Sequence, residues 1–251
     1  MNIAVILAGR CGKEAAAEPP RPFVQVGDKP ILIHTLGAFE AHPSIDSIGV
    51  VCLEGWQPQL RAYARAFGIT KLDWIVTGGA TVQESIYRGV RRLEGWCRAD
   101  DVVVIHDGIR PLVEPAVISN VLATCAQHGN AVAALPYTEQ MFCADPGDIG
   151  STVTYIPRDS LRRVSTPQAY RYDILAARYR QAFATGRGLG PGAYANTLMV
   201  ELGERLHFAA GSDKNIRLTT AADLELFRAL LGVRPEYDLP ERTRPREPVL
   251  A

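Results

Sequence analysis

The chain has 251 residues, of which 47% are hydrophobic, and its 27 basic side chains balance 27 acidic ones. A chain of this length and composition is typical of one water-soluble domain with a buried core. Neutral charge argues against binding to duplex nucleic acid, and the strand-length apolar runs argue against a membrane span. Five scattered cysteines without a CxxC pair, together with an N-terminus that lacks a secretory pattern, predict free thiols, no zinc site and a cytoplasmic location.

Strand-like and helix-like segments alternate along the chain. Apolar runs predict buried strands at 3–8, 48–53, 74–76, 101–106 and 131–135, and helical patterns lie at 34–42, 57–67, 81–95, 115–128 and 172–184. This alternation predicts an α/β fold with a parallel, doubly wound sheet. Ligands bind beyond the carboxyl ends of such strands, so the loops after Ala8, Leu53, Val76, His106 and Leu135 are candidate site segments.

The stretch from 138 to 165 interrupts this rhythm. It combines a turn at 145–148 with a β-branched, strand-forming run at 151–156. An arm that pairs with another subunit and a long surface hairpin are both compatible with this composition. The segment 232–251 holds four prolines among many charges, which predicts a disordered tail after a folded domain at 1–231.

The first candidate site is the loop after the first strand, with Leu7, Ala8, Gly9, Gly12 and Lys13. Small residues at the end of a strand allow backbone N–H groups to approach a phosphate closely. The alternative is a tight turn without a ligand, since this loop is neither a Walker A motif nor a complete GxGxxG motif.

The second candidate is Asp107, which follows an apolar strand directly, with Arg110 three residues later. An aspartate at the end of a parallel strand can hold Mg²⁺ on nucleotide phosphates, and an arginine presents a planar fork of donors to an anion. The alternative is an Asp107 that caps a helix and pairs with Arg110.

Three further segments carry polar groups at turns. Gly78 and Gly79 precede a helix start with Ser85, where a base or ribose could bind, although Thr81 and Glu84 alone would form a capping box. The other two segments, 158–168 and 215–224, are each ordinary in isolation. The order of all these motifs along one chain is what carries information.

This set of motifs resembles the cytidylyltransferases of sugar-alcohol phosphates, the group that contains the methylerythritol-4-phosphate and ribitol-5-phosphate enzymes. The resemblance covers roughly residues 1–231, and the matching segments are 7–9, 29–36, 78–85, 106–111, 166–168 and 215–220. The amino-acid sequence at 52–56, 83–87 and 106–108 resembles the ribitol branch more closely than the methylerythritol branch. The resemblance implies a Rossmann-like nucleotide-diphospho-sugar transferase fold, with a mainly parallel sheet flanked by helices and a β-arm for a homodimer.

The resemblance also implies a reaction, in which a sugar-alcohol phosphate attacks the α-phosphate of CTP with Mg²⁺ as cofactor, pyrophosphate leaves and a CDP-alcohol forms. The positive charges at the reacting phosphates would be Lys13, Arg21 and Arg217. The nucleotide would be bound by Leu7, Ala8, Gly9, Gly12, Gly78, Gly79, Ser85 and Asp107, the last beside the metal. The acceptor would be bound by Arg110, Thr138, Thr166 and Arg158, with Arg158 reaching across the dimer.

The sequence departs from the family pattern at several of these positions. Glu14 stands where the family has a catalytic arginine, which reverses the charge that faces a triphosphate, and Arg10, Lys13 or Arg21 could restore positive charge. Further departures are Gln140 for a threonine, Tyr194 for an acidic residue and Arg217 for a lysine. Two alternatives therefore stay open, a non-catalytic relative that binds a nucleotide or a protein partner, and a nucleotidyltransferase that uses another nucleotide.

Overall fold

The computed structural model describes residues 1–9, 19–190 and 192–232. A seven-stranded sheet has the order β11-β7-β10-β6-β1-β4-β5. The strands are β1 (Asn2–Ala8), β4 (Ser47–Cys52), β5 (Leu72–Thr77), β6 (Val102–Asp107), β7 (Asn130–Pro136), β10 (Arg162–Arg171) and β11 (Phe208–Ala210). All neighbours pair in parallel except β10, which runs antiparallel to both β6 and β7. The predicted α/β fold with a mainly parallel sheet is confirmed.

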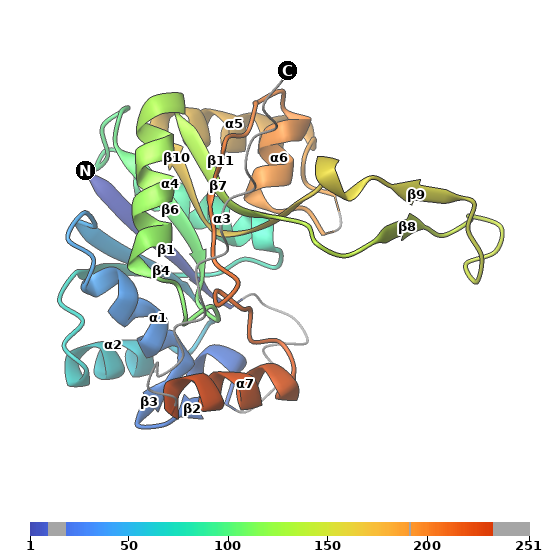
Figure 1. Cartoon of the computed structure of the whole chain (residues 1–251). Helices are drawn as coiled ribbons and strands as arrows, with labels where there is room; N and C mark the ends of the chain where they lie inside the picture. The colour runs from blue at the N-terminus through green and yellow to red at the C-terminus, as the bar shows by residue number, and fades with distance from the viewer. Residues whose placement is uncertain (10–18, 191, 233–251) are drawn as a thin grey trace, which may run out of the picture.

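Helices cover both faces of this sheet (Figure 1). On one face lie α1 (Ile31–Glu40), α2 (Gln57–Ala66) and α4 (Pro115–His128), and on the other lie α3 (Val82–Arg92), α5 (Tyr172–Thr185) and α6 (Ala195–Glu201). Alternate residues of β1 serve the two cores, since Ala4 and Ile6 face the first layer while Ile3 and Val5 face the second. Both faces of the central strands are therefore buried, which explains their continuous apolar runs.

A third, smaller core lies beside the carboxyl ends of the strands. It joins α7 (Ala221–Gly232) to α1 and to a hairpin of β2 (Gln25–Val26) and β3 (Lys29–Pro30), with Phe227 fully buried at its centre. The 3-10 helix η2 (Arg21–Phe23) precedes this hairpin. At the start of α7, Asp223 accepts hydrogen bonds from the backbone N–H groups of Thr219 and Thr220 at 2.8 and 2.6 Å. This small core brings segments near residues 21 and 219 together.

Of the arm predicted over 138–165, the part before β10 leaves the sheet as a projecting hairpin of β8 (Met141–Cys143) and β9 (Thr154–Ile156), whereas 162–165 already pair with β7 in the sheet (Figure 1). The strand predicted over 151–156 is correct only at its last three residues, because Thr152 turns its hydroxyl onto the backbone of Thr154. A short 3-10 helix, η3 (Arg158–Ser160), leads back into β10. Pairing of this arm with a second subunit stays a prediction. Of the tail predicted over 232–251, Gly232 ends α7 and the rest lies outside the described residues.

No helix in the described ranges is both long and apolar enough to cross a membrane.

Candidate active site

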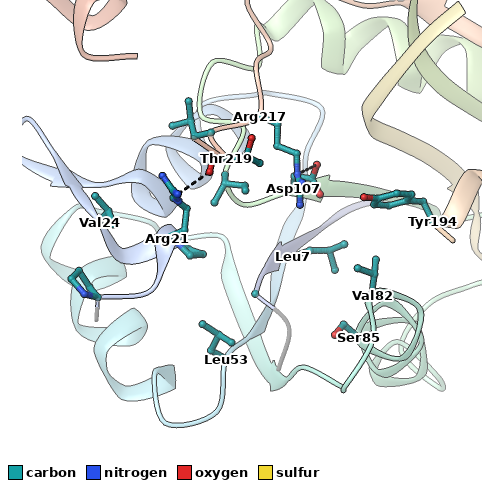
Figure 2. A pocket seen from close by; sticks show the side chains of 15 residues that line it. Leu7, Arg21, Val24, Leu53, Val82, Ser85, Asp107, Tyr194, Arg217 and Thr219 are labelled. Atoms are coloured by element: carbon teal, nitrogen blue, oxygen red, sulfur yellow. Dashed lines mark hydrogen bonds and ion pairs between the residues drawn. The ribbon is translucent and has the colours of Figure 1, made fainter. Parts of the chain in front are cut away.

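A pocket of about 500 Å³ opens beyond the carboxyl ends of three neighbouring strands (Figure 2). Leu7 and Gly9 reach it from β1, Leu53 from the end of β4 and Asp107 from the end of β6. This is the edge at which doubly wound sheets bind their ligands. Four of the five candidate loops meet here or directly beside it, whereas the loop after β7 leads into the arm.

Two chemically different walls face each other across this pocket. One wall comes from the α3–α6 layer and consists of Val82, Ser85 and Tyr194. The opposite wall comes from η2 and the segment before α7, and it carries Arg21, Arg217 and Thr219. We call these the uncharged wall and the arginine wall.

Glycines allow the loops at the floor of the pocket to pack backbone against backbone. Gly9 has a φ of +132°, and a Cβ there would lie 2.5 Å from Cγ of Leu53. A Cβ at Gly78 would lie 3.1 Å from the carbonyl oxygen of Gly9 and 3.2 Å from Oγ of Ser85. Larger residues would therefore force these loops apart. Gly78 and Gly79 lie directly behind Ser85 rather than lining the pocket, and Ala8 is buried beneath it.

The turn between β5 and α3 is fixed by side chains of the helix that follows. Ser85 accepts a hydrogen bond from the Gly79 N–H at 2.9 Å, and Thr81 caps α3 by accepting from the Glu84 N–H at 3.0 Å. The Glu84 carboxylate accepts from the Ala80 N–H at 2.8 Å, and this bond together with Arg88 lowers its pKa. The expected capping by the Thr81 side chain is present. The Glu84 carboxylate, however, bonds to the N–H of Ala80, the residue before the cap, and not to the N–H of Thr81.

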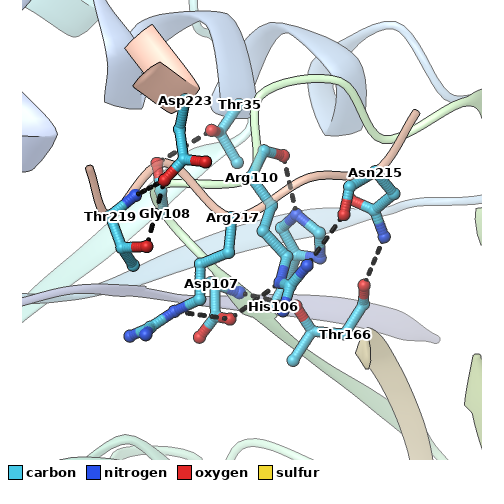
Figure 3. A network of polar contacts seen from close by, with 10 residues as sticks. All are labelled: Thr35, His106, Asp107, Gly108, Arg110, Thr166, Asn215, Arg217, Thr219 and Asp223. Carbon is cyan, nitrogen blue, oxygen red and sulfur yellow. Dashed lines mark hydrogen bonds and ion pairs between the residues drawn. The ribbon is translucent and has the colours of Figure 1, made fainter. Parts of the chain in front are cut away.

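Asp107 is the carboxylate of the pocket. Its Oδ2 accepts a hydrogen bond from Nε of Arg110 at 2.9 Å and lies 3.4 Å from Nε of Arg217 (Figure 3). The pairing with Arg110 that was considered as an alternative is therefore present. The accompanying suggestion of a helix cap is wrong, because Asp107 ends β6 and the next helix begins only at Pro115.

A network of hydrogen bonds holds Asp107 and its arginines (Figure 3). Nη1 of Arg110 donates to the Asn215 carbonyl at 2.7 Å, and Nδ2 of Asn215 donates to the Thr166 carbonyl at 2.6 Å. Thr166 closes the circuit, since its Oγ1 accepts from the Asp107 N–H at 3.1 Å. Arg110 and Thr166 thus lie behind Asp107 and not on the pocket surface, where acceptor-binding residues were expected.

His106 supports the same network from inside the sheet. Its Nε2 lies 3.1 Å from the carbonyl oxygen of Arg110, which fixes the turn after β6. Complete burial lowers the pKa of His106 to about 4. The imidazole is consequently neutral at physiological pH and acts as a structural neighbour of Asp107.

The arginine wall supplies the positive charge of the pocket. Nη2 of Arg21 donates to the Thr219 carbonyl at 2.8 Å, which holds η2 against the segment before α7. Nε of Arg217 is buried and forms the 3.4 Å ion pair with Asp107, which is not aligned as a hydrogen bond. An anionic group in the pocket would satisfy such a donor and would be attracted to both guanidinium groups.

The other predicted site residues lie elsewhere. Thr138 and Arg158 belong to the projecting arm, where Arg158 lines a second cavity of about 370 Å³ with Phe142 and Tyr155. Gly12 and Lys13, like Arg10 and Glu14, lie outside the described residues.

Sequence reasoning did not anticipate Val82, Leu53 or Thr219 as pocket residues, and it singled out Tyr194 only as a departure from the family pattern. The position of Leu53 at the end of a predicted strand was a usable signal. Tyr194 follows a glycine-rich segment, 186–193, and nothing local indicates that it turns toward α3.

An α/β sheet whose carboxyl edge carries a pocket with close-packed glycines, two arginines and one carboxylate is typical of nucleotide-binding enzymes. The family model described as IspD, 2-C-methyl-D-erythritol 4-phosphate cytidylyltransferase, matches residues 2–233. The chain belongs to this family of cytidylyltransferases.

Individual relatives agree with the family assignment. The chain is 51% identical over 231 residues to a ribitol-5-phosphate cytidylyltransferase of Lacticaseibacillus paracasei, covering 92% of this chain and 98% of that one. It is 33% identical to a 2-C-methyl-D-erythritol 4-phosphate cytidylyltransferase of Geotalea uraniireducens, covering 91% and 95%. The solved structure of the Thermus thermophilus 2-C-methyl-D-erythritol 4-phosphate cytidylyltransferase superposes with a TM-score of 0.69 at 26% identity, covering 91% and 98%.

Proposed function

We propose that this enzyme transfers the cytidylyl group of CTP to ribitol 5-phosphate or a closely similar sugar-alcohol phosphate. The observation that carries the choice of acceptor is the 51% identity, over nearly the whole of both chains, to a ribitol-5-phosphate cytidylyltransferase. The methylerythritol relative from Geotalea uraniireducens shares 33%. Methylerythritol 4-phosphate is the second candidate acceptor, because the matching family model carries its name.

In the proposed reaction, each wall of the pocket would bind a different part of CTP. A phosphate oxygen of the acceptor forms a bond to the α-phosphorus of CTP, and the bond from that phosphorus to the bridging oxygen of pyrophosphate breaks. Arg21 and Arg217 would hold the negatively charged phosphates, and the nucleoside would lie toward the uncharged wall. Such a transfer depends mainly on positioning and on positive charge around the phosphates.

The residues of the pocket fit a Mg²⁺ ion that is held jointly with the nucleotide. Mg²⁺ in nucleotide sites is commonly bound by one or two carboxylates together with substrate phosphates. The pocket offers the single carboxylate of Asp107, and no group of three or more metal-ligating side chains occurs within the described ranges. When bound, Mg²⁺ would neutralise charge that develops on the leaving pyrophosphate.

We further propose that the arm forms a homodimer in which Arg158 and Thr138 of one subunit complete the acceptor site of the other. Several large apolar side chains of the arm are exposed in the single chain, among them Phe142 at 59% and Tyr155 at 67%. Exposed apolar clusters of this kind are commonly covered by a partner. Within one chain Arg158 is remote from the pocket, so a second copy is needed to bring it there.

Pyrophosphate release tests the proposed function. The enzyme would be assayed with Mg²⁺ and CTP, ATP, GTP or UTP, and with ribitol 5-phosphate, methylerythritol 4-phosphate or glycerol 3-phosphate as acceptor. We expect the highest kcat/KM for CTP with ribitol 5-phosphate. Higher efficiency with methylerythritol 4-phosphate would contradict the acceptor, preference for another nucleotide would contradict CTP, and CTP binding without turnover would favour a non-catalytic role.

A further inference from the structure

Tyr194 is the largest side chain of the uncharged wall. Its ring lies above Val82 and across from the arginine wall, and its hydroxyl points into the pocket toward Asp107 (Figure 2). Tyr194 is 43% exposed, and the hydrogen bonds that it forms with Gln83 and Thr197 use its backbone N–H and carbonyl groups. An amphipathic ring that opens onto a ligand pocket offers both an apolar face and a polar handle.

The backbone at Tyr194 is held by a buried network that begins in α3. Gln83 is only 3% exposed, and its Nε2 donates to the carbonyl oxygen of Tyr194 at 2.9 Å. Its Oε1 accepts from the hydroxyl of the fully buried Tyr179 at 2.6 Å, which fixes the orientation of the amide. Thr197 completes the arrangement by accepting from the Tyr194 N–H at 2.8 Å.

The same helix therefore sets both parts of the uncharged wall. The first turn of α3 presents Val82 and Ser85 to the pocket, and Gln83, between them in sequence, holds Tyr194 beside them. A buried amide with all these partners is costly to disturb, so the backbone of Tyr194, from which the ring projects, is held beside the first turn of α3. Such fixed placement is what a substrate contact requires.

We infer that Tyr194 contacts the nucleoside of CTP, with its ring packed against the cytidine and its hydroxyl bonded to a ribose hydroxyl. This inference rests on the proposed function. Phosphates are drawn to Arg21 and Arg217, so the uncharged part of the nucleotide occupies the wall that Tyr194 shares with Val82. Ribose lies between base and phosphates, and the Tyr194 hydroxyl points from the uncharged wall toward the middle of the pocket.

The test compares Tyr194→Ala and Tyr194→Phe with Val200→Ala, an exposed control in the same helix, α6, that does not line the pocket. Calorimetry gives the Kd of CTP and of 2′,3′-dideoxy-CTP, and steady-state kinetics give the KM of each substrate. We expect Tyr194→Ala to weaken CTP binding about 10-fold through loss of the ring contact. Tyr194→Phe should weaken CTP about 5-fold and leave dideoxy-CTP unchanged, since only the hydroxyl bond is lost.

Three results would overturn this inference. A rise in acceptor KM with unchanged CTP affinity would assign Tyr194 to the acceptor, and unchanged binding of all ligands would remove it from the site. Equal losses for CTP and dideoxy-CTP in Tyr194→Phe would remove the ribose contact. If the wild-type enzyme binds no CTP, the proposed function fails as well, whereas failure of the variants alone leaves it intact. Tyr194→Phe decides the matter if Tyr194→Ala does not fold.

Discussion

Asp107 pairs with positive charge and also lines the pocket. Its carboxylate faces Arg110 and Arg217 while it remains open to the pocket. We predict that Asp107→Asn lowers pyrophosphate release at least about 100-fold, since the substitution removes both the metal ligand and the charge that orients Arg217. Thermal unfolding should change little, because the amide keeps an acceptor for Arg110. Turnover that survives the change at near wild-type rate would show that Asp107 holds no essential metal.

His106 gives the fold a pH dependence of known sign. Its pKa is about 4 in the folded chain against 6.5 for an exposed histidine, so the unfolded state binds a proton first as the pH falls. The free energy of unfolding therefore decreases from pH 6.5 toward pH 4, by about 2 kcal/mol at pH 5. This contribution is fully present above pH 6.5.

The variant His106→Gln removes the titrating group and can still donate a hydrogen bond toward Arg110. Urea unfolding at pH 7.5 and at pH 5 should show that the wild-type chain loses about 2 kcal/mol more than the variant. Equal losses in both proteins would mean that His106 is not the group responsible. His34 and His42, whose pKa values are also lowered by burial, contribute equally to both proteins and cancel in this comparison.

Pocket residues can be predicted from the sequence where a local motif already indicates their chemistry. Asp107 and Ser85 are singled out in this way, Arg217 only through the family resemblance, and all three line the pocket. Tyr194 and Val82 share a wall because Gln83, at the start of α3, holds the carbonyl of Tyr194, a long-range contact that no local pattern contains. Arg110 and Thr166 were expected at the acceptor, but in the single chain they form the support behind Asp107.

Among the elements, α3 determines the shape of the uncharged wall. Arg88, one turn beyond Glu84, donates to the Gly78 carbonyl at 2.8 Å and forms a 2.6 Å ion pair with Glu84. Both side chains thus support the 77–80 turn from outside the pocket. The ion pair is solvent-exposed and adds little stability, so its effect should fall on the geometry of the turn.

We therefore predict that Arg88→Ala raises the KM for CTP about 5-fold, with kcat and the acceptor KM nearly unchanged. Arg92→Ala, an exposed arginine of the same helix, is the matched control and should behave like wild type. Arg88→Lys, which keeps the charge and one donor, should recover part of the loss. A uniform fall in kcat with unchanged CTP affinity would speak against this role for the turn.

Sequence patterns predict the strands that are buried on both faces, and they miss strands that are exposed or very short. Strands such as β1 and β6 are buried on both faces, so their apolar runs were visible. The first half of β10 is exposed and begins with two arginines, so no apolar run or alternation identified it. The short β2–β3 hairpin shares its core with α7, almost 200 residues away, and no local pattern contains that contact.

For the whole molecule, an acceptor site completed by Arg158 needs two copies of the chain. We expect a dimer in size-exclusion chromatography with light scattering at micromolar concentration. We also predict that Arg158→Ala and Asp107→Asn, each inactive alone, regain activity when mixed. A heterodimer would contain one site with an intact Asp107 from one subunit and an intact Arg158 from the other.

A monomer at micromolar concentration, or a mixture that stays inactive after subunit exchange has been verified, would contradict the shared site. The control is Asp107→Asn alone at the total protein concentration of the mixture, which shows whether a higher concentration by itself restores activity.

The most direct test of the central claim is the identity of the product. The wild-type enzyme would be incubated with CTP, ribitol 5-phosphate and Mg²⁺ and followed by ³¹P nuclear magnetic resonance with mass spectrometry of the products. The account predicts pyrophosphate and CDP-ribitol in equal amounts, with loss of both substrates. Unchanged CTP, or hydrolysis of CTP without a CDP-alcohol, would contradict it.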